Sequence, residues 1–115
     1  MPTPLHIESN TQQIKVQIPQ EFDGFLVDKV RDQLDALIAQ NQPAIILDLS
    51  HTTFIDSSGI GAIVFLYKRL VSQNRTLHLQ QVNGQPLKLM TMLHVDRTIP
   101  VNVQQDVTQH NLQQA

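Results

Sequence analysis

The run Asp56-Ser57-Ser58-Gly59 holds the side chains of this chain that are best suited to chemistry. A short apolar run precedes it, and residues at helical spacing follow it, namely Ile60, Ile63, Val64, Tyr67, Leu70 and Val71. This order predicts a strand that delivers a pair of serines to the start of a helix. The N–H groups and the positive dipole end of a helix start attract anions. A hydroxyl in that place is therefore suited to carry a phosphate.

Two glycines weaken the start of this helix. Gly59 and Gly61 fall in its first turn, where glycine is less favourable than alanine by up to about 1 kcal/mol. Such local conflicts are expected where function or a close backbone approach is at stake, and absent side chains leave N–H groups open to an incoming group. The residues alone leave two alternatives open. Asp56, Ser57 or Ser58 simply caps the helix, or the glycines serve close packing against a sheet.

Hydrophobic periodicity predicts the remaining elements. Alternating residues over 5–9 and 14–18 indicate an antiparallel hairpin, and the run 45–49 behind Pro43 indicates a strand covered on both faces. Further strands are expected over 77–80 and 99–103, the latter at a sheet edge. Helices are expected over 23–40, over 58–74 and through Leu93 from Pro86, placed at the first helical position.

The order of these elements predicts an α/β fold. A mixed sheet of four to five strands begins with the N-terminal hairpin and continues through parallel crossovers, with helices packed against it. We expect a single domain over 1–115, with an ordered core of about 5–103. Residues 104–115 are expected to form a short C-terminal helix, capped by Asp106, or a tail. Ser58 then follows the carboxyl end of a strand, the usual functional edge of such sheets.

The segments Ile46-Leu47-Asp48-Leu49 and Phe54-Ile55-Asp56-Ser57-Ser58-Gly59-Ile60-Gly61 resemble the signature of the STAS domain. They are most similar to those of bacterial anti-sigma factor antagonists. In that family a partner anti-sigma factor, itself a kinase, phosphorylates the second serine of this run. The resemblance therefore implies that Ser58 is the phosphoacceptor, with Ser57 as the second choice.

A second segment, Glu21-Phe22-Asp23, resembles the Gly-Glu-Leu-Asp signature of the same family, although Gln20 replaces the glycine. Asp23 is equally well explained as a helix N-cap. In the family this segment lies on the same edge as the phosphorylated loop. The resemblance thus implies a partner-binding surface formed by Glu21, Asp23, Asp56, Ser57, Ser58, Gly59 and Ile60. Near the third helix, His94-Val95 stands where the family usually has Gly-Leu.

Composition excludes several classes of function. A formal net charge of -2, 4% aromatic residues and no tryptophan argue against direct nucleic-acid binding. The absence of cysteine excludes disulfides and thiolate catalysis. No signal peptide or membrane-spanning run is apparent, so we expect a soluble cytoplasmic protein that does not bind membranes.

The sequence lacks the motifs of common enzymes and cofactor sites. The histidines are scattered without paired metal-ligand spacing, and Gly59-Ile60-Gly61 lacks the third glycine of a dinucleotide site. His51 is more simply explained as an ordinary loop histidine than as a general base for Ser58. We expect no catalytic, metal or cofactor-binding residues and no enzyme activity; ATP and Mg²⁺ would belong to the partner kinase.

These arguments lead to one principal function and two alternatives. The unphosphorylated chain is expected to bind an anti-sigma factor/serine kinase and thereby to regulate sigma-factor-dependent transcription. Phosphorylation of Ser58 switches it off, and a phosphoserine phosphatase restores it. The first alternative is an assembly module of a transporter or lipid-transport complex that is not phosphorylated. The second is a small serine hydrolase with a base near Ser58.

Overall fold

A five-stranded mixed sheet forms the centre of the fold. The computed structural model describes residues 5–104, so the helix expected at Asp106 lies outside the described residues. The strand order is β1-β2-β4-β6-β7. Within residues 5–104, only β1 and β2 pair antiparallel, which confirms the hairpin and the parallel crossovers. The strands are β1 (His6–Ser9), β2 (Gln13–Gln17), β4 (Ala44–Asp48), β6 (Thr76–Val82) and β7 (Val101–Val103).

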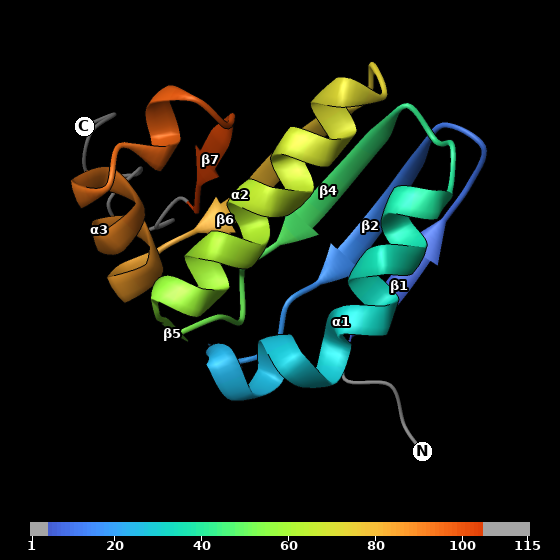
Figure 1. Cartoon of the computed structure of the whole chain (residues 1–115). Helices are drawn as coiled ribbons and strands as arrows, with labels where there is room; N and C mark the ends of the chain where they lie inside the picture. The colour runs from blue at the N-terminus through green and yellow to red at the C-terminus, as the bar shows by residue number, and fades with distance from the viewer. Residues whose placement is uncertain (1–4, 105–115) are drawn as a thin grey trace, which may run out of the picture.

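Two long helices cover one face of this sheet, as Figure 1 shows. They are α1 (Gly24–Ala39) and α2 (Ser57–Ser72), and each connects two parallel strands of the sheet. The shorter α3 (Gly84–Met92) packs against the short strand β5 (Phe54–Ile55) and is followed by the 3₁₀ helix η1 (Val95–Arg97). Both helices are part of right-handed crossovers and pack on the same face of the sheet. Their N-terminal ends therefore lie at the same edge of the sheet.

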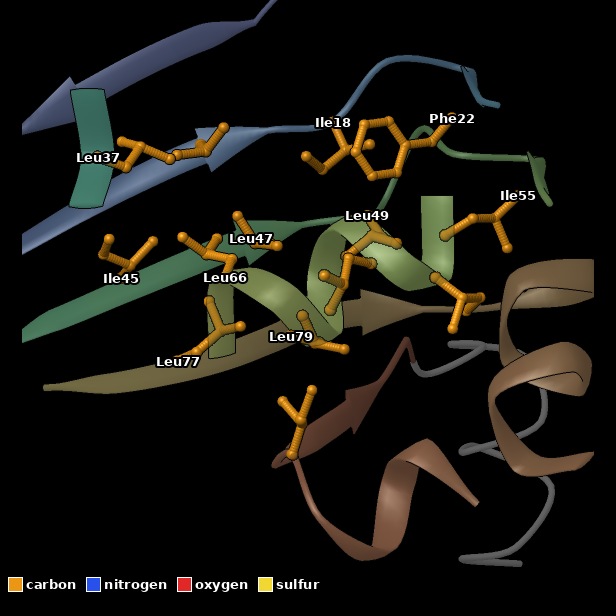
Figure 2. Close-up of a cluster of buried hydrophobic side chains, with 14 of the residues drawn as sticks. Ile18, Phe22, Leu37, Ile45, Leu47, Leu49, Ile55, Leu66, Leu77 and Leu79 are labelled. Carbon is orange, nitrogen blue, oxygen red and sulfur yellow. The ribbon is translucent and has the colours of Figure 1, made fainter. Parts of the chain in front are cut away.

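Alternating residues of the sheet build one hydrophobic core beneath these helices. Side chains such as those of Ile45, Leu47 and Leu79 are at most 1% exposed and point toward the helices (Figure 2). Leu37 of α1 and Leu66 of α2 close the core from the other side. The apolar residues at helical spacing in α1 and α2 therefore pack against the apolar residues at every second position of the strands.

The opposite face of the sheet is only half-buried in the described part of the chain. Lys15, Ile46 and His78 lie side by side on adjacent strands and are each of intermediate exposure. The expectation that the strand at 45–49 is covered on both faces is therefore wrong for 5–104. Its apolar run reflects one buried face plus Ile46, rather than two buried faces.

A second, two-stranded sheet was not expected from the sequence. β3 (Glu21–Phe22) and β5 (Phe54–Ile55) pair in parallel, with Glu21 opposite Phe54 and Phe22 opposite Ile55. Strands of two residues are too short to show a hydrophobic period. This small sheet matters because α1 follows β3 after one residue, and α2 follows β5 in the same way.

Helix boundaries differ from expectation by one or two residues. α2 begins at Ser57, one residue before the expected start, and α3 begins at Gly84, so that Pro86 is the third helical residue and not the first. Beyond α3, His94 adopts the left-handed conformation with φ of 60°. A glycine takes that conformation without strain, which explains the physical role of the glycine that the resembled family carries there.

Candidate functional site

The starts of α1 and α2 are built in the same way and lie beside each other. Each helix follows one strand of the β3–β5 pair and begins with an aspartate N-cap. Oδ1 of Asp23 accepts a hydrogen bond from the N–H of Leu26 at 3.0 Å. Oδ1 of Asp56 accepts one from the N–H of Gly59 at 2.9 Å. The capping roles considered for Asp23 and Asp56 are thus confirmed.

Asp56 also bridges the two helices. Its Oδ2 accepts a hydrogen bond from the N–H of Gly24, the first residue of α1, at 3.1 Å. The hydrogen bond from Gly59 lowers the pKa of Asp56 most, against an opposing effect of desolvation, and the N–H groups of Gly24 and Ser58 lower it further. The carboxylate is therefore ionised at neutral pH and holds two positive helix ends together.

This bridge corrects one expectation from the sequence. The N–H of Gly59 is not open to an incoming anion, because the carboxylate of Asp56 already occupies it. Ser57 and Ser58 are the first two residues of α2, and both are exposed. A phosphate on either serine would therefore lie next to a resident anion instead of filling an empty anion site.

The two glycines of the first turn have different roles. A Cβ atom added at Gly59 would lie 2.2 Å from the carbonyl oxygen of Phe22 and 2.6 Å from Cγ1 of Ile55, so close packing requires glycine there. A Cβ atom at Gly61 would meet no atom of the described residues within 4 Å. Close packing therefore explains Gly59, whereas no packing contact explains Gly61, which leaves an open patch of surface on α2.

Gly24 is a site residue that sequence reasoning missed. A Cβ atom on Gly24 would lie 3.1 Å from Oγ of Ser58, although the two residues are far apart in the chain. The hydroxyl of Ser58 therefore lies against the start of α1 as well as the start of α2. The only signal in the sequence was the Asp23-Gly24 pair before a helical period, and it does not indicate which residue Gly24 faces.

Hydrogen bonds to the side chain of Gln85 and to the backbone of Gln20 hold β5, the strand that leads to the serines. The Gln85 amide accepts a hydrogen bond from the N–H of Ile55 and donates one to its carbonyl, both at 2.9 Å. The carbonyl of Gln20 accepts hydrogen bonds from the N–H groups of Thr53 and Phe54 at 2.8 and 3.2 Å. Gln20 contributes its backbone carbonyl to this contact, and its φ is not positive. A glutamine at this position, where the resembled family has glycine, therefore causes no backbone strain.

The structure brings all the predicted partner-binding residues to one edge, with different exposures. Glu21, Ser57 and Ser58 are exposed, and Asp23 and Asp56 are half-buried. Gly59 and Ile60 are buried and support the exposed residues from beneath. The partner-binding role of these seven residues remains a prediction.

In the part of the chain that the structure describes, no site for serine hydrolysis or metal binding is assembled. His51 lies exposed in the turn after β4, and the described residues show no hydrogen bond between it and Ser58. Among residues 5–104, no group of three or more His, Cys, Asp or Glu side chains is placed to hold a metal ion. The helices of this same part of the chain are all too short or too polar to span a bilayer.

Comparison with known proteins identifies the family. Residues 5–110 match the family model of the STAS domain. The anti-sigma F factor antagonist of Paenibacillus polymyxa is 29% identical over 98 residues, which are 84% of each chain. The Bacillus cell fate determinant SpoIIAA in its phosphorylated form is similar in structure, with a TM-score of 0.68, 16% identity and coverage of 96% of this chain and 99% of that one.

A second solved structure, from a transporter family, shares the same fold. The sulfate transporter family protein of Wolinella succinogenes gives a TM-score of 0.66 at 18% identity, over 76% of this chain and 74% of that one. At such identities, a structural likeness carries the fold and not the function. The match over 5–110, with its central mixed sheet and its Asp-Ser-Ser-Gly helix start, shows that this chain belongs to the STAS domain family.

Proposed function

We propose that this chain is an anti-sigma factor antagonist that is controlled by phosphorylation of Ser58. The unmodified chain binds an anti-sigma factor with serine kinase activity, and the phosphorylated chain does not. The relative named anti-sigma F factor antagonist supports the role. One observation carries the choice of site: Ser58 is exposed where the starts of α1 and α2 meet.

Ser58 is favoured over Ser57 by its neighbours. Both serines are exposed in the first turn of α2, but only Ser58 lies within contact distance of the position that a Cβ atom of Gly24 would take. A phosphate on Ser58 is thus near the positive ends of two helices, each of which favours a negative charge by about 0.3–1 kcal/mol. The carboxylate of Asp56 offsets part of this gain. We therefore expect the fold to persist after phosphorylation.

The switch acts at the contact surface. A phosphoserine adds a charge of about -1.5 to -2 at pH 7. Next to Asp56, this charge must be desolvated when a partner covers the edge. A penalty of about 3 kcal/mol lowers the affinity by more than about a hundredfold. ATP and Mg²⁺ come from the kinase, and a phosphoserine phosphatase would reset the chain.

A phosphorylation assay tests this function. The chain is incubated with anti-sigma kinases of its source organism, ATP and Mg²⁺, and the phosphate is mapped by mass spectrometry. We expect one phosphate on Ser58, none in Ser58→Ala, and an unchanged yield in the control Ser72→Ala, an exposed serine at the other end of α2. Ser58→Ala should still bind the kinase, and Ser58→Asp should bind more weakly. A phosphate found only at other residues rejects the proposal.

A second candidate is an assembly module of a transporter or lipid-transport complex. The name of the sulfate transporter family protein, whose fold this chain shares, motivates it. In that case Ser58→Ala and Ser58→Asp leave function unchanged, and the native chain co-purifies with a membrane transport complex. The phosphorylation assay and this co-purification give opposite outcomes for the two candidates.

A further inference from the structure

An open groove lies between α1 and α2 on the outer side of the helix layer. Its volume is about 460 Å³, within the range of about 300–1,000 Å³ typical of binding pockets. It extends from the paired helix starts at Gly24 and Ser58 to Ile38 near the end of α1. One end of the groove is therefore the proposed phosphorylation site.

The groove has an apolar floor and an exposed aromatic wall. Val27, Leu34 and Ile38 of α1 and Leu66 of α2 contribute the floor. Phe65 lines the groove and is 53% exposed. An apolar floor with a few charged residues at its rim is the usual composition of a binding groove.

In the described part of the chain, the charged rim of the groove carries one negative charge without an ion-pair partner. The charged side chains in its lining are those of Asp28, Arg31 and Asp35. Nη2 of Arg31 pairs with Oδ1 of Asp28 at 3.0 Å. Asp35 is exposed and has no ion-pair partner among residues 5–104. Charge complementarity therefore favours an occupant that places a cation at Asp35.

The shape of the lining favours a helix. On α1, the lining residues recur every three or four positions from Gly24 to Ile38, a straight stripe of about 21 Å at about 1.5 Å per residue. The side chains of a third helix, laid along this stripe, match that spacing. The N-terminal ends of α1 and α2 lie together at Ser58, so an antiparallel helix there presents its negative C-terminal end.

We propose that this groove receives an amphipathic helix of the anti-sigma kinase, with its apolar face over Phe65 and a lysine or arginine at Asp35. This inference rests on the proposed function and adds the chemistry of the partner's docking element. The C-terminal end of the docked helix lies at Ser58, where its free carbonyl groups are negative. A phosphate on Ser58 repels that end, which couples the groove to the switch.

Charge reversal tests the cationic contact. The unphosphorylated chain is titrated with the ADP-bound kinase by calorimetry. Asp35→Lys should weaken binding by at least about tenfold, an effect that decreases at high salt. The matched control Asp32→Lys makes the same charge change at an exposed position of the same helix outside the groove, and should stay within about twofold of the unmodified chain. Equal effects of the two variants overturn the proposal.

Truncation of the aromatic wall tests the apolar contact. Phe65→Ala should weaken binding by about tenfold, since exposed aromatic anchors dominate such contacts. Val71→Ala is the control, because Val71 is 49% exposed on the same helix but does not line the groove. Both positions are exposed, so the free energy of unfolding should change little, and the chain should stay folded. Unchanged binding of Phe65→Ala contradicts the proposal.

The two proposals fail in distinguishable ways. If no kinase phosphorylates Ser58, the proposed function fails. If Ser58 is phosphorylated but Asp35→Lys and Phe65→Ala bind the kinase as the unmodified chain does, only the groove assignment fails. Sedimentation of the chain alone shows whether a second copy fills the groove instead of the kinase helix. A dimer that Asp35→Lys dissociates would also overturn the groove assignment.

Discussion

Asp56 and Gly24 connect the starts of two helices through one hydrogen bond, from the N–H of Gly24 to Oδ2 of Asp56 at 3.1 Å. The two residues are 32 positions apart in the chain. Because the other oxygen of the same carboxylate caps α2, neither helix start can shift without breaking a bond at the other. Ser58 is therefore positioned by both helices together.

Removal of the bridging carboxylate should destabilise the domain. Asp56→Ala loses an N-cap worth about 1 kcal/mol and leaves the N–H of Gly24 without its partner, at a cost of about 1–2 kcal/mol. We expect the free energy of unfolding in urea to fall by about 2–3 kcal/mol. Asp32→Ala, at an exposed position of α1, should change it by less than about 0.5 kcal/mol. Equal losses in the two variants would disprove the bridging role.

The same carboxylate should make stability depend on pH. The pKa of Asp56 in the folded chain lies below its ordinary value of 3.8, so the unfolded state binds more protons near that pH. The contribution of Asp56 to stability is thus complete above about pH 5 and is lost as the pH falls through the folded pKa. The difference in unfolding free energy between the unmodified chain and Asp56→Asn should be constant from pH 7 to 5 and shrink below pH 4. A difference that grows on acidification would reverse the assigned sign.

The two glycines of the first turn of α2 should respond oppositely to alanine. Gly59→Ala places a methyl group within 2.2 Å of a backbone oxygen and should destabilise the domain by about 1–3 kcal/mol or more. The methyl group of Gly61→Ala meets no atom of residues 5–104 within 4 Å, so this change should be neutral or stabilising by up to about 1 kcal/mol. Thermal and urea unfolding measure both changes. A stable Gly59→Ala would show that α2 is less closely packed than described.

A methyl group at Gly24 should interfere with phosphorylation more than with folding. In Gly24→Ala the added carbon lies 3.1 Å from Oγ of Ser58, a flexible side-chain end that can move by rotation. We expect a change in unfolding free energy below about 1 kcal/mol. The rate of Ser58 phosphorylation by the kinase should fall, since the hydroxyl is displaced or shielded. If stability falls while the rate is unchanged, the contact is structural only.

Arg75, a buried arginine at the opposite edge of the sheet, should stabilise the domain in a way that lysine cannot. Arg75 is 6% exposed, and it donates hydrogen bonds to the carbonyl of Gln42 at 2.7 Å, to the carbonyl of Ile38 at 3.3 Å and to Oε1 of Gln73 at 2.7 Å. A lysine cannot reproduce this planar fork, and Arg75→Lys should lower the free energy of unfolding by about 1–3 kcal/mol.

The control for this prediction is Arg69→Lys. Arg69 is exposed on α2, and its guanidinium lies 5.9 Å from the ring centre of Phe65, an exposed contact of small worth. Its replacement should change the free energy of unfolding by less than about 0.5 kcal/mol. Similar losses in the two lysine variants would show that the buried network around Arg75 contributes little.

Elements with a long hydrophobic period were predictable from the sequence. The helix expected over 23–40 is α1 (Gly24–Ala39), and the hairpin and the strands around 45–49 and 77–80 are present with shifts of one or two residues. The Asp-Ser-Ser-Gly run correctly located a helix start. Each of these features depends on residues that are neighbours in the chain, so their spacing alone determines the outcome.

The geometry of the candidate site was decided by the tertiary structure. The pairing of β3 with β5, the bridge from Asp56 to Gly24 and the clamp of Gln85 on Ile55 each join segments about 30 residues apart. No local pattern encodes such contacts, because they form only when crossovers bring the two helix starts to one sheet edge. The sequence by itself determined that a serine begins a helix; the packing of that helix beside another decided what surrounds the serine's hydroxyl.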